Sequence, residues 1–125
     1  MNYSDLTRHH FESATNAGVL SGPGTRRGAA GSRAHGTWVR FDVQVDANDR
    51  PETLQAVRFL AYACPHVIAV ADWIATRAVG LKTECLLPES VLSLQRRFEV
   101  PTEKLGRLLI VEDAWIAAVS PPHLR

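Results

Sequence analysis

The stretch FLAYACPHVIAVADWIATRAVG, residues 59–80, joins an alternating segment to a helical one, and this junction decides the fold. The alternation of side chains begins near residue 54 and is typical of a half-buried strand. After Cys64 the period changes. Pro65 suits the first position of a helix, where its missing N–H costs nothing, and apolar residues then recur at helical spacing until Gly80. The stretch therefore predicts a strand, a thiol at the joint and a helix.

A second alternating segment, TWVRFDVQVD, covers residues 37–46. Its even positions are mostly polar and its odd positions are apolar, as expected of a strand with one buried face. Residues 47–52, ANDRPE, read as a turn before the strand of residues 54–62. The two strands are predicted to form an antiparallel hairpin.

The remaining chain is read as helices and links. We predict a helix over residues 2–12 with Ser4 as its N-cap, because Asp5 suits the first turn. Residues 16–36 are rich in glycine and read as a loop with room for one short strand. Further helices are predicted over residues 88–98 and 105–120, and two prolines end the second of them. The whole, residues 1–125, is predicted to be one α+β domain: a small antiparallel three-stranded sheet packed with helices on one face.

Composition excludes several classes of function. The chain has 125 residues, 46% of them hydrophobic, and a formal net charge of +1, so nothing in its charge favours nucleic acid or an anionic membrane. It has two cysteines, too few for a disulfide framework, and no apolar run of the roughly 20 residues that cross a membrane. We expect a cytoplasmic protein with reduced thiols. No Ser-His-Asp arrangement, phosphate-binding loop or carboxylate pair is legible, and we expect no enzymatic activity.

Three stretches, in order, resemble the IscU/NifU-type iron–sulfur cluster scaffold proteins. MNYSDLTRHHFESATNAG is similar to the opening of that family, which leads from a Tyr-Ser start into an amphipathic helix. YACPHVIAVADWI resembles its Tyr-Gly-Cys-Gly turn and the helix that follows. VPTEKLGRLLIVEDAWIAAV resembles its C-terminal block, including the EDA-x-x-A pattern. The resemblance implies the family's fold and a role in iron–sulfur cluster assembly.

The family holds a nascent [2Fe–2S] cluster, or zinc, on three cysteines with an Asp or His nearby. Carried over by position, its first cysteine falls on His35 and the following Asp on Thr37. Its second cysteine is kept as Cys64. Its adjacent His-Cys pair falls on Gly106 and Arg107. The resemblance therefore implies a site with one thiolate, at most two imidazoles and a fixed positive charge.

This ligand set is incomplete. A [2Fe–2S] cluster takes four ligands, usually thiolates, and a guanidinium repels metal cations. We expect His35, Cys64 and Arg107 to converge on one exposed edge, with [2Fe–2S] or zinc bound at low occupancy or no metal at all. A homodimer could rescue the site by placing two copies of Cys64 and His35 around one cluster.

Each site residue has an ordinary reading beside the functional one. Cys64 is either a thiolate favoured by the helix N-terminus or a small capping residue. His35 is a ligand or a surface histidine. His66 is a third metal ligand or, as we expect, an exposed histidine in the first helical turn. Arg107 either contacts the Cys64 thiolate or a bound anion, or is solvated, whereas Cys85 is expected to pack in the interior.

Partners follow from the resemblance alone. It implies a cysteine desulfurase that delivers sulfur, and an Hsp70-type chaperone whose Leu-Pro-Pro-Val-Lys target matches this chain at Pro101 and Lys104. Tyr3 matches an N-terminal tyrosine of the family, and the alternative is an anchor for the first helix. Two other functions stay open: a metal-free interaction module that keeps the scaffold surface, and a small thiol-dependent enzyme built on Cys64 and His35.

Overall fold

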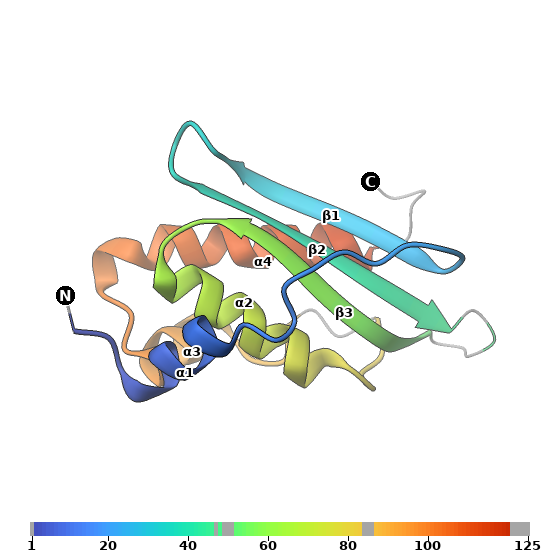
Figure 1. The fold of residues 1–125 in the computed structure, drawn as a ribbon, viewed down its shortest axis with the longest axis horizontal. Coiled ribbons are helices and arrows are strands. Elements are labelled where there is room, and N and C mark those ends of the chain that lie inside the picture. The colour runs from blue at the N-terminus through green and yellow to red at the C-terminus, as the bar shows by residue number, and fades with distance from the viewer. Residues whose placement is uncertain (1, 47, 49–51, 84–86, 121–125) are drawn as a thin grey trace.

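The protein is an α+β structure with a three-stranded antiparallel sheet and helices packed on one of its faces (Figure 1). The computed structural model describes residues 2–46, 48, 52–83 and 87–120. Its elements, in chain order, are α1 (Asp5–Ser13), β1 (Thr25–Ser32), β2 (Thr37–Asp46), β3 (Thr53–Tyr62), α2 (Pro65–Ala78), α3 (Val91–Phe98), the 3₁₀ turn η1 (Thr102–Lys104) and α4 (Leu105–Val119). The predicted fold class is confirmed.

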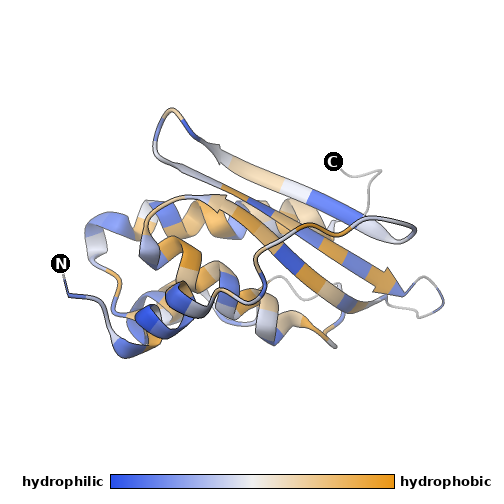
Figure 2. Ribbon diagram, viewed as in Figure 1, coloured by the Kyte–Doolittle hydropathy of each residue, from blue (hydrophilic) through white to orange (hydrophobic). Residues whose placement is uncertain are grey.

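The predicted hairpin is present, and a third strand completes the sheet in the order β1-β2-β3. Phe41 in the middle of β2 faces Gly28 of β1 and Phe59 of β3, while Trp38 faces Tyr62 near one end. Of the predicted turn 47–52, only residues 48 and 52 are described. The alternation along β2 and β3 appears as bands of apolar and polar colour in Figure 2. The strand period read from the sequence was therefore correct.

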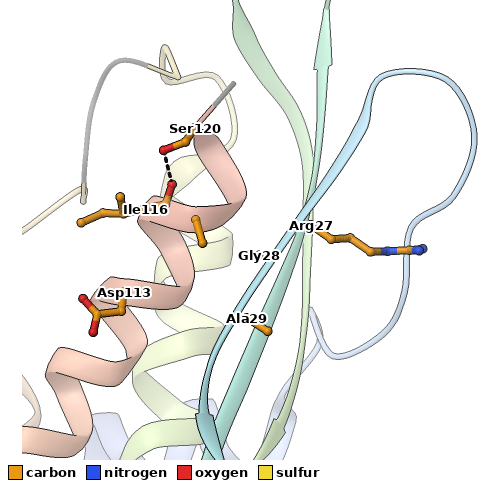
Figure 3. Close-up of a pocket in the computed structure, with 7 residues that line it drawn as sticks. Arg27, Gly28, Ala29, Asp113, Ile116 and Ser120 are labelled. Atoms are coloured by element: carbon orange, nitrogen blue, oxygen red, sulfur yellow. Dashed lines mark hydrogen bonds between the residues drawn. The ribbon is translucent and has the colours of Figure 1, made fainter. Parts of the chain in front are cut away.

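Strand β1 was expected only as one short strand inside a loop, and it is eight residues long. Two of the glycines that suggested a loop, Gly28 and Gly31, lie in β1, and Gly28 has a packing role. A Cβ added to Gly28 would lie 2.1 Å from the backbone nitrogen of Ala118 and 2.4 Å from the carbonyl carbon of Ala117. Helix α4 lies against β1 at this position (Figure 3). A bare backbone here permits an approach that any side chain would block.

The face of Leu54 was predicted wrongly. Strict alternation placed Leu54 with Arg58, but Leu54 is only 1% exposed. The register between β2 and β3 shifts between Gln44 and Val45, which is a β-bulge. One extra residue exchanges the two faces of a strand beyond it, so Leu54 turns into the core.

The core lies between the sheet and the helices α2 and α4. The ring of Phe41 meets that of Trp115 edge to face, with 5.1 Å between centroids. The apolar stripe predicted for α2 is buried as expected and consists of Val67, Val70, Ala71, Ile74 and Ala78. Fully burying a valine or isoleucine side chain of this stripe contributes about 1.5–3 kcal/mol, and an alanine contributes less.

Helix α1 is fixed to α2 through a buried carboxylate. Asp72 is 2% exposed, and its Oδ2 lies 2.7 Å from Nδ1 of His10. Its Oδ1 accepts the backbone N–H of Asn16 at 3.0 Å. Ser4 caps α1 as predicted, accepting the N–H of Thr7 at 3.1 Å. A buried carboxylate needs hydrogen-bond partners, and Asp72 finds them in and just after α1. The contacts of Asp72 therefore hold α1 against α2.

Two helices begin later than predicted, and the first of them, α1, begins at Asp5 rather than at residue 2. Helix α3 begins at Val91 rather than near residue 88, because Ser90 caps it and accepts the N–H of Ser93 at 3.2 Å. Helix α2 ends at Ala78, two residues before Gly80. Within the described residues, no helix combines the length and the apolar composition that crossing a membrane requires.

Candidate functional site

Cys64 lies at the junction of β3 and α2, as predicted. It is the N-cap residue of α2, with Pro65 at the first helical position and an extended backbone at φ −76° and ψ 165°. The side chain is half-buried rather than enclosed. Strand β3 ends at Tyr62, and the chain reverses direction at Cys64, so that α2 runs back along the sheet (Figure 1). The thiol therefore stands at a helix N-terminus with access to solvent.

Two cations from the C-terminal part of the chain accompany this thiol. Burial raises the pKa of Cys64. The Val67 amide, the Arg107 guanidinium and the charge of Lys104 each lower it, and together they outweigh the effect of burial. The net pKa lies below that of an ordinary cysteine. Lys104 ends η1 and Arg107 lies in the first turn of α4, so the η1–α4 junction delivers both charges. This arrangement stabilises the thiolate.

His66 is buried, which corrects the expectation of an exposed first-turn histidine. Its side chain is 1% exposed, and the ring of Tyr3 packs against it edge to face at 4.8 Å. Burial and the charges of Lys104 and Arg107 lower the pKa of His66, which favours the neutral ring. Nζ of Lys104 lies 3.1 Å from Nδ1 of His66. An ammonium group only donates, so Nδ1 accepts and its lone pair is engaged.

His35 lies in the exposed turn between β1 and β2, where its N–H donates to the carbonyl of Ser32. Thr37, the first residue of β2, is 4% exposed. Because Trp38 pairs with Tyr62, this turn and Cys64 lie at the same end of the sheet. Arg107 is exposed, and its guanidinium is among the groups that lower the pKa of Cys64. In the part of the chain that the structure describes, no three His, Cys, Asp or Glu side chains come together to hold a metal ion.

The side chains at the family's ligand positions do not fit a [2Fe–2S] cluster. Cys64 offers the one thiolate among them, and Arg107 brings a positive charge to its sulfur. Gly106 has no side chain, and a Cβ added there would meet nothing within 4 Å. A cluster held by four soft ligands therefore lacks most of its donors at this end of one chain.

Of four other residues singled out in the sequence, the structure describes three. Tyr3 is an anchor, since its ring covers His66. Pro101 precedes η1 and caps it, and Lys104 is directed to His66. Sequence reasoning assigned Lys104 to a chaperone motif and missed its place beside Cys64. Its position three residues before Arg107 is the signal that could have revealed it. Cys85 lies outside the described residues.

The thiol site predicts a measurable acidity. In a Cys85→Ser background, where Cys64 is the remaining thiol, iodoacetamide should react with a midpoint pH below that of free cysteine. Arg107→Gln should raise this midpoint, because it removes both the contact and the charge of the guanidinium. The pH dependence of the alkylation rate measures it. Arg96→Gln, an exposed arginine in α3, is the matched control and should leave the midpoint unchanged. Equal midpoints for all three proteins would contradict the assignment.

A groove elsewhere carries no comparable chemistry. It lies between β1 and the C-terminal half of α4, lined by Arg27, Gly28, Ala29, Asp113, Ile116, Ala117 and Ser120 (Figure 3). Arg107 lies at the opposite end of α4, so this groove is separate from Cys64.

Comparisons with known proteins support the resemblance. The N-terminal part of a nitrogen-fixing NifU-like protein from Brucella abortus has a similar structure, with a TM-score of 0.70 and 14% identity, covering 93% of this chain and 90% of that one. A protein assigned as an iron–sulfur cluster assembly scaffold of the SUF system, from thermophilic Fervidobacterium islandicum AW-1, has a TM-score of 0.64 and 10% identity, covering 94% and 96%. A comparison with curated protein sequences found no match. The family described as the NifU-like N terminal domain matches residues 2–121, and the chain belongs to that family.

Proposed function

We propose that this protein works in iron–sulfur cluster assembly as a scaffold-type member that presents one activated thiolate, Cys64, instead of a complete set of cluster ligands. Family membership supports the assembly role. The role is one of carrying and docking rather than catalysis.

The observation that carries this proposal is the pair of cations at Cys64. Lys104 and Arg107 lower the pKa of the thiol, so at any given pH more of Cys64 is thiolate than in an ordinary cysteine. A thiolate paired with a guanidinium is a nucleophile and an anion, whereas a metal ligand needs its surroundings free of fixed positive charge. The same features favour a metal-free partner-binding protein over a tight metal carrier.

The partner that fits this thiolate is a cysteine desulfurase. Such an enzyme presents a cysteine persulfide, and the Cys64 thiolate would attack its terminal sulfur. The S–S bond of the enzyme persulfide breaks, the inner sulfur leaves as the enzyme thiolate, and a new persulfide forms on Cys64, which then loses its proton to water. Arg107 would then stabilise the persulfide anion, because a persulfide is also a soft anion at neutral pH.

Sulfur transfer tests the proposal directly. The full chain is incubated with a cysteine desulfurase and ³⁵S-labelled cysteine, and label on the protein is read after non-reducing separation. We expect label on the wild type that reducing agent releases, full loss in Cys64→Ser, and retention in Cys85→Ser. Cys64→Ser and Cys85→Ser each keep a single cysteine, so comparing them shows whether the label is bound at residue 64.

Other outcomes separate the alternatives. Label retained in Cys64→Ser would contradict the proposed role of Cys64. An unlabelled wild type that still binds the desulfurase in solution would leave the metal-free interaction module as the better description. The chaperone implied by Pro101 and Lys104 is not part of the proposal, since the Lys104 side chain is directed to His66.

A further inference from the structure

The sheet face opposite α2 and α4 carries an unusual number of arginines. Phe41 and Val57 point into the core, so their neighbours along the strands point to the other side. Arg27, Asp42 and Arg58 form one cross-strand row there. Figure 3 shows the Arg27 side chain directed away from α4.

The next rows toward the Cys64 end add further cations and two aromatic rings. Arg40 pairs across the strands with Leu60, and Trp38 pairs with Tyr62. The Arg33 guanidinium, from the β1–β2 turn, lies over the Trp38 ring at 5.1 Å from its centroid. Tyr62 is 56% exposed. We call Arg33, Trp38, Arg40, Arg58 and Tyr62 the arginine–aromatic face.

One carboxylate on this side is already used within the chain. Asp42 is 1% exposed, with Oδ1 lying 3.0 Å from Nε of Arg40 and Oδ2 lying 3.2 Å from Nε of Arg27. It also accepts the backbone N–H of Leu20 at 3.0 Å, and the N–H of Gly18 donates to the carbonyl of Phe59 at 2.9 Å. The segment leading to β1 therefore crosses the sheet at the row of Asp42 and Arg58, and leaves the rows nearer Tyr62 to other partners. Asp46, the other acid in the three strands, ends β2 at the opposite end from Trp38. The half of the face near Tyr62 is therefore positive.

We propose that the arginine–aromatic face is a docking surface for an acidic segment of a protein partner. Guanidinium forks match carboxylates in pairs, and Asp42 shows within the chain how this face holds one. Trp, Tyr and Arg are the residues that dominate the centres of protein interfaces. Nucleic acid fits less well, because the chain has a net charge of only +1 and gives no long-range attraction for a polyanion.

The arginine–aromatic face lies next to the end of the sheet that carries Cys64. Tyr62 precedes Cys64 by two residues, so a partner bound over Trp38 and Tyr62 would reach the thiol end of the sheet. The proposal does not depend on the chemistry assigned to Cys64, since binding is measured without any sulfur transfer.

The test uses the full chain and a fluorescein-labelled peptide of alternating glutamate and alanine, followed by fluorescence anisotropy. Arg33→Glu should weaken binding about tenfold, because it reverses the charge that lies over the Trp38 ring. Arg96→Glu, with the same change of net charge on exposed α3, should change affinity less than about twofold. Tyr62→Ala, which leaves all charges in place, should also weaken binding. In NMR spectra, the indole N–H signal of Trp38 should shift when the peptide is added. Added salt should reduce the affinity for the peptide.

Several results would overturn the proposal. Equal losses for Arg33→Glu and Arg96→Glu would show attraction to net charge only. Tighter binding of a thymidine oligonucleotide of equal charge, with the same loss in Arg33→Glu, would assign the face to nucleic acid. An unchanged Trp38 signal during peptide binding would place the peptide elsewhere.

Discussion

Replacing His35 and Arg107 by cysteine together is expected to raise the zinc affinity of this protein about 100-fold. Structural zinc sites with four ligands bind with about 10–16 kcal/mol, which is roughly 3 kcal/mol per ligand. Arg107→Cys adds a ligand, whereas His35→Cys exchanges an imidazole for a thiolate. The gain of one ligand is then worth about 3 kcal/mol, at about 1.4 kcal/mol per tenfold change in affinity. Arg107→Cys also removes the positive charge that interacts with the Cys64 sulfur. Competition with a chromophoric chelator at fixed pH measures the affinity.

The control for this gain adds two thiols without rebuilding the site. His35→Cys/Arg96→Cys carries the same number of cysteines, but residue 96 lies in α3 rather than beside Cys64. It should bind zinc far more weakly than the rebuilt protein. Anaerobic reconstitution with iron and sulfide extends the test to the cluster, for which Arg107→Cys should gain iron over the wild type. A stable stoichiometric cluster in the wild-type monomer would refute the incomplete ligand set.

The second large effect concerns stability at the contact between β1 and α4. Gly28→Ala is expected to lower the free energy of unfolding by about 3 kcal/mol, at the upper end of the cost of overpacking a core. The added Cβ would sit 2.1 Å from the Ala118 nitrogen, and backbone of a helix cannot move aside as a flexible side chain can. Urea unfolding followed by tryptophan fluorescence measures the change. A domain typically has only about 5–15 kcal/mol in total, so the loss would be easily detected.

Gly106→Ala is the matched control, since it is the same substitution in a place with open space. A Cβ added to Gly106 meets nothing within 4 Å, and the residue lies inside α4. Alanine in a helix is favoured over glycine by about 0.5–1 kcal/mol, so this variant should be slightly more stable than the wild type. A Gly28→Ala protein that unfolds at the wild-type urea concentration would show that α4 can retreat from β1.

Local periodicity made several features predictable. The strand of residues 37–46 and the change from strand to helix at Cys64 follow from side-chain alternation and from Pro65, which act over only a few residues. Strand β1 was harder to predict, because its glycines have the composition of a loop. They form a strand only because α4 packs on them from the far end of the sequence.

The sequence by itself determined the order of the elements and the thiol at the N-terminus of α2. It also determined the change of residue at four positions where the resemblance places ligands, namely 35, 37, 106 and 107, since these features depend on residue identity and short-range spacing. Tertiary structure alone decided the chemistry around the thiol. Lys104 and His66 are 38 residues apart in the chain and meet at 3.1 Å. The burial of His66 and of Leu54 likewise depends on Tyr3 and on a register shift at Gln44. Hydrophobic periodicity and composition describe single segments, and they do not specify which distant segments pack against one another.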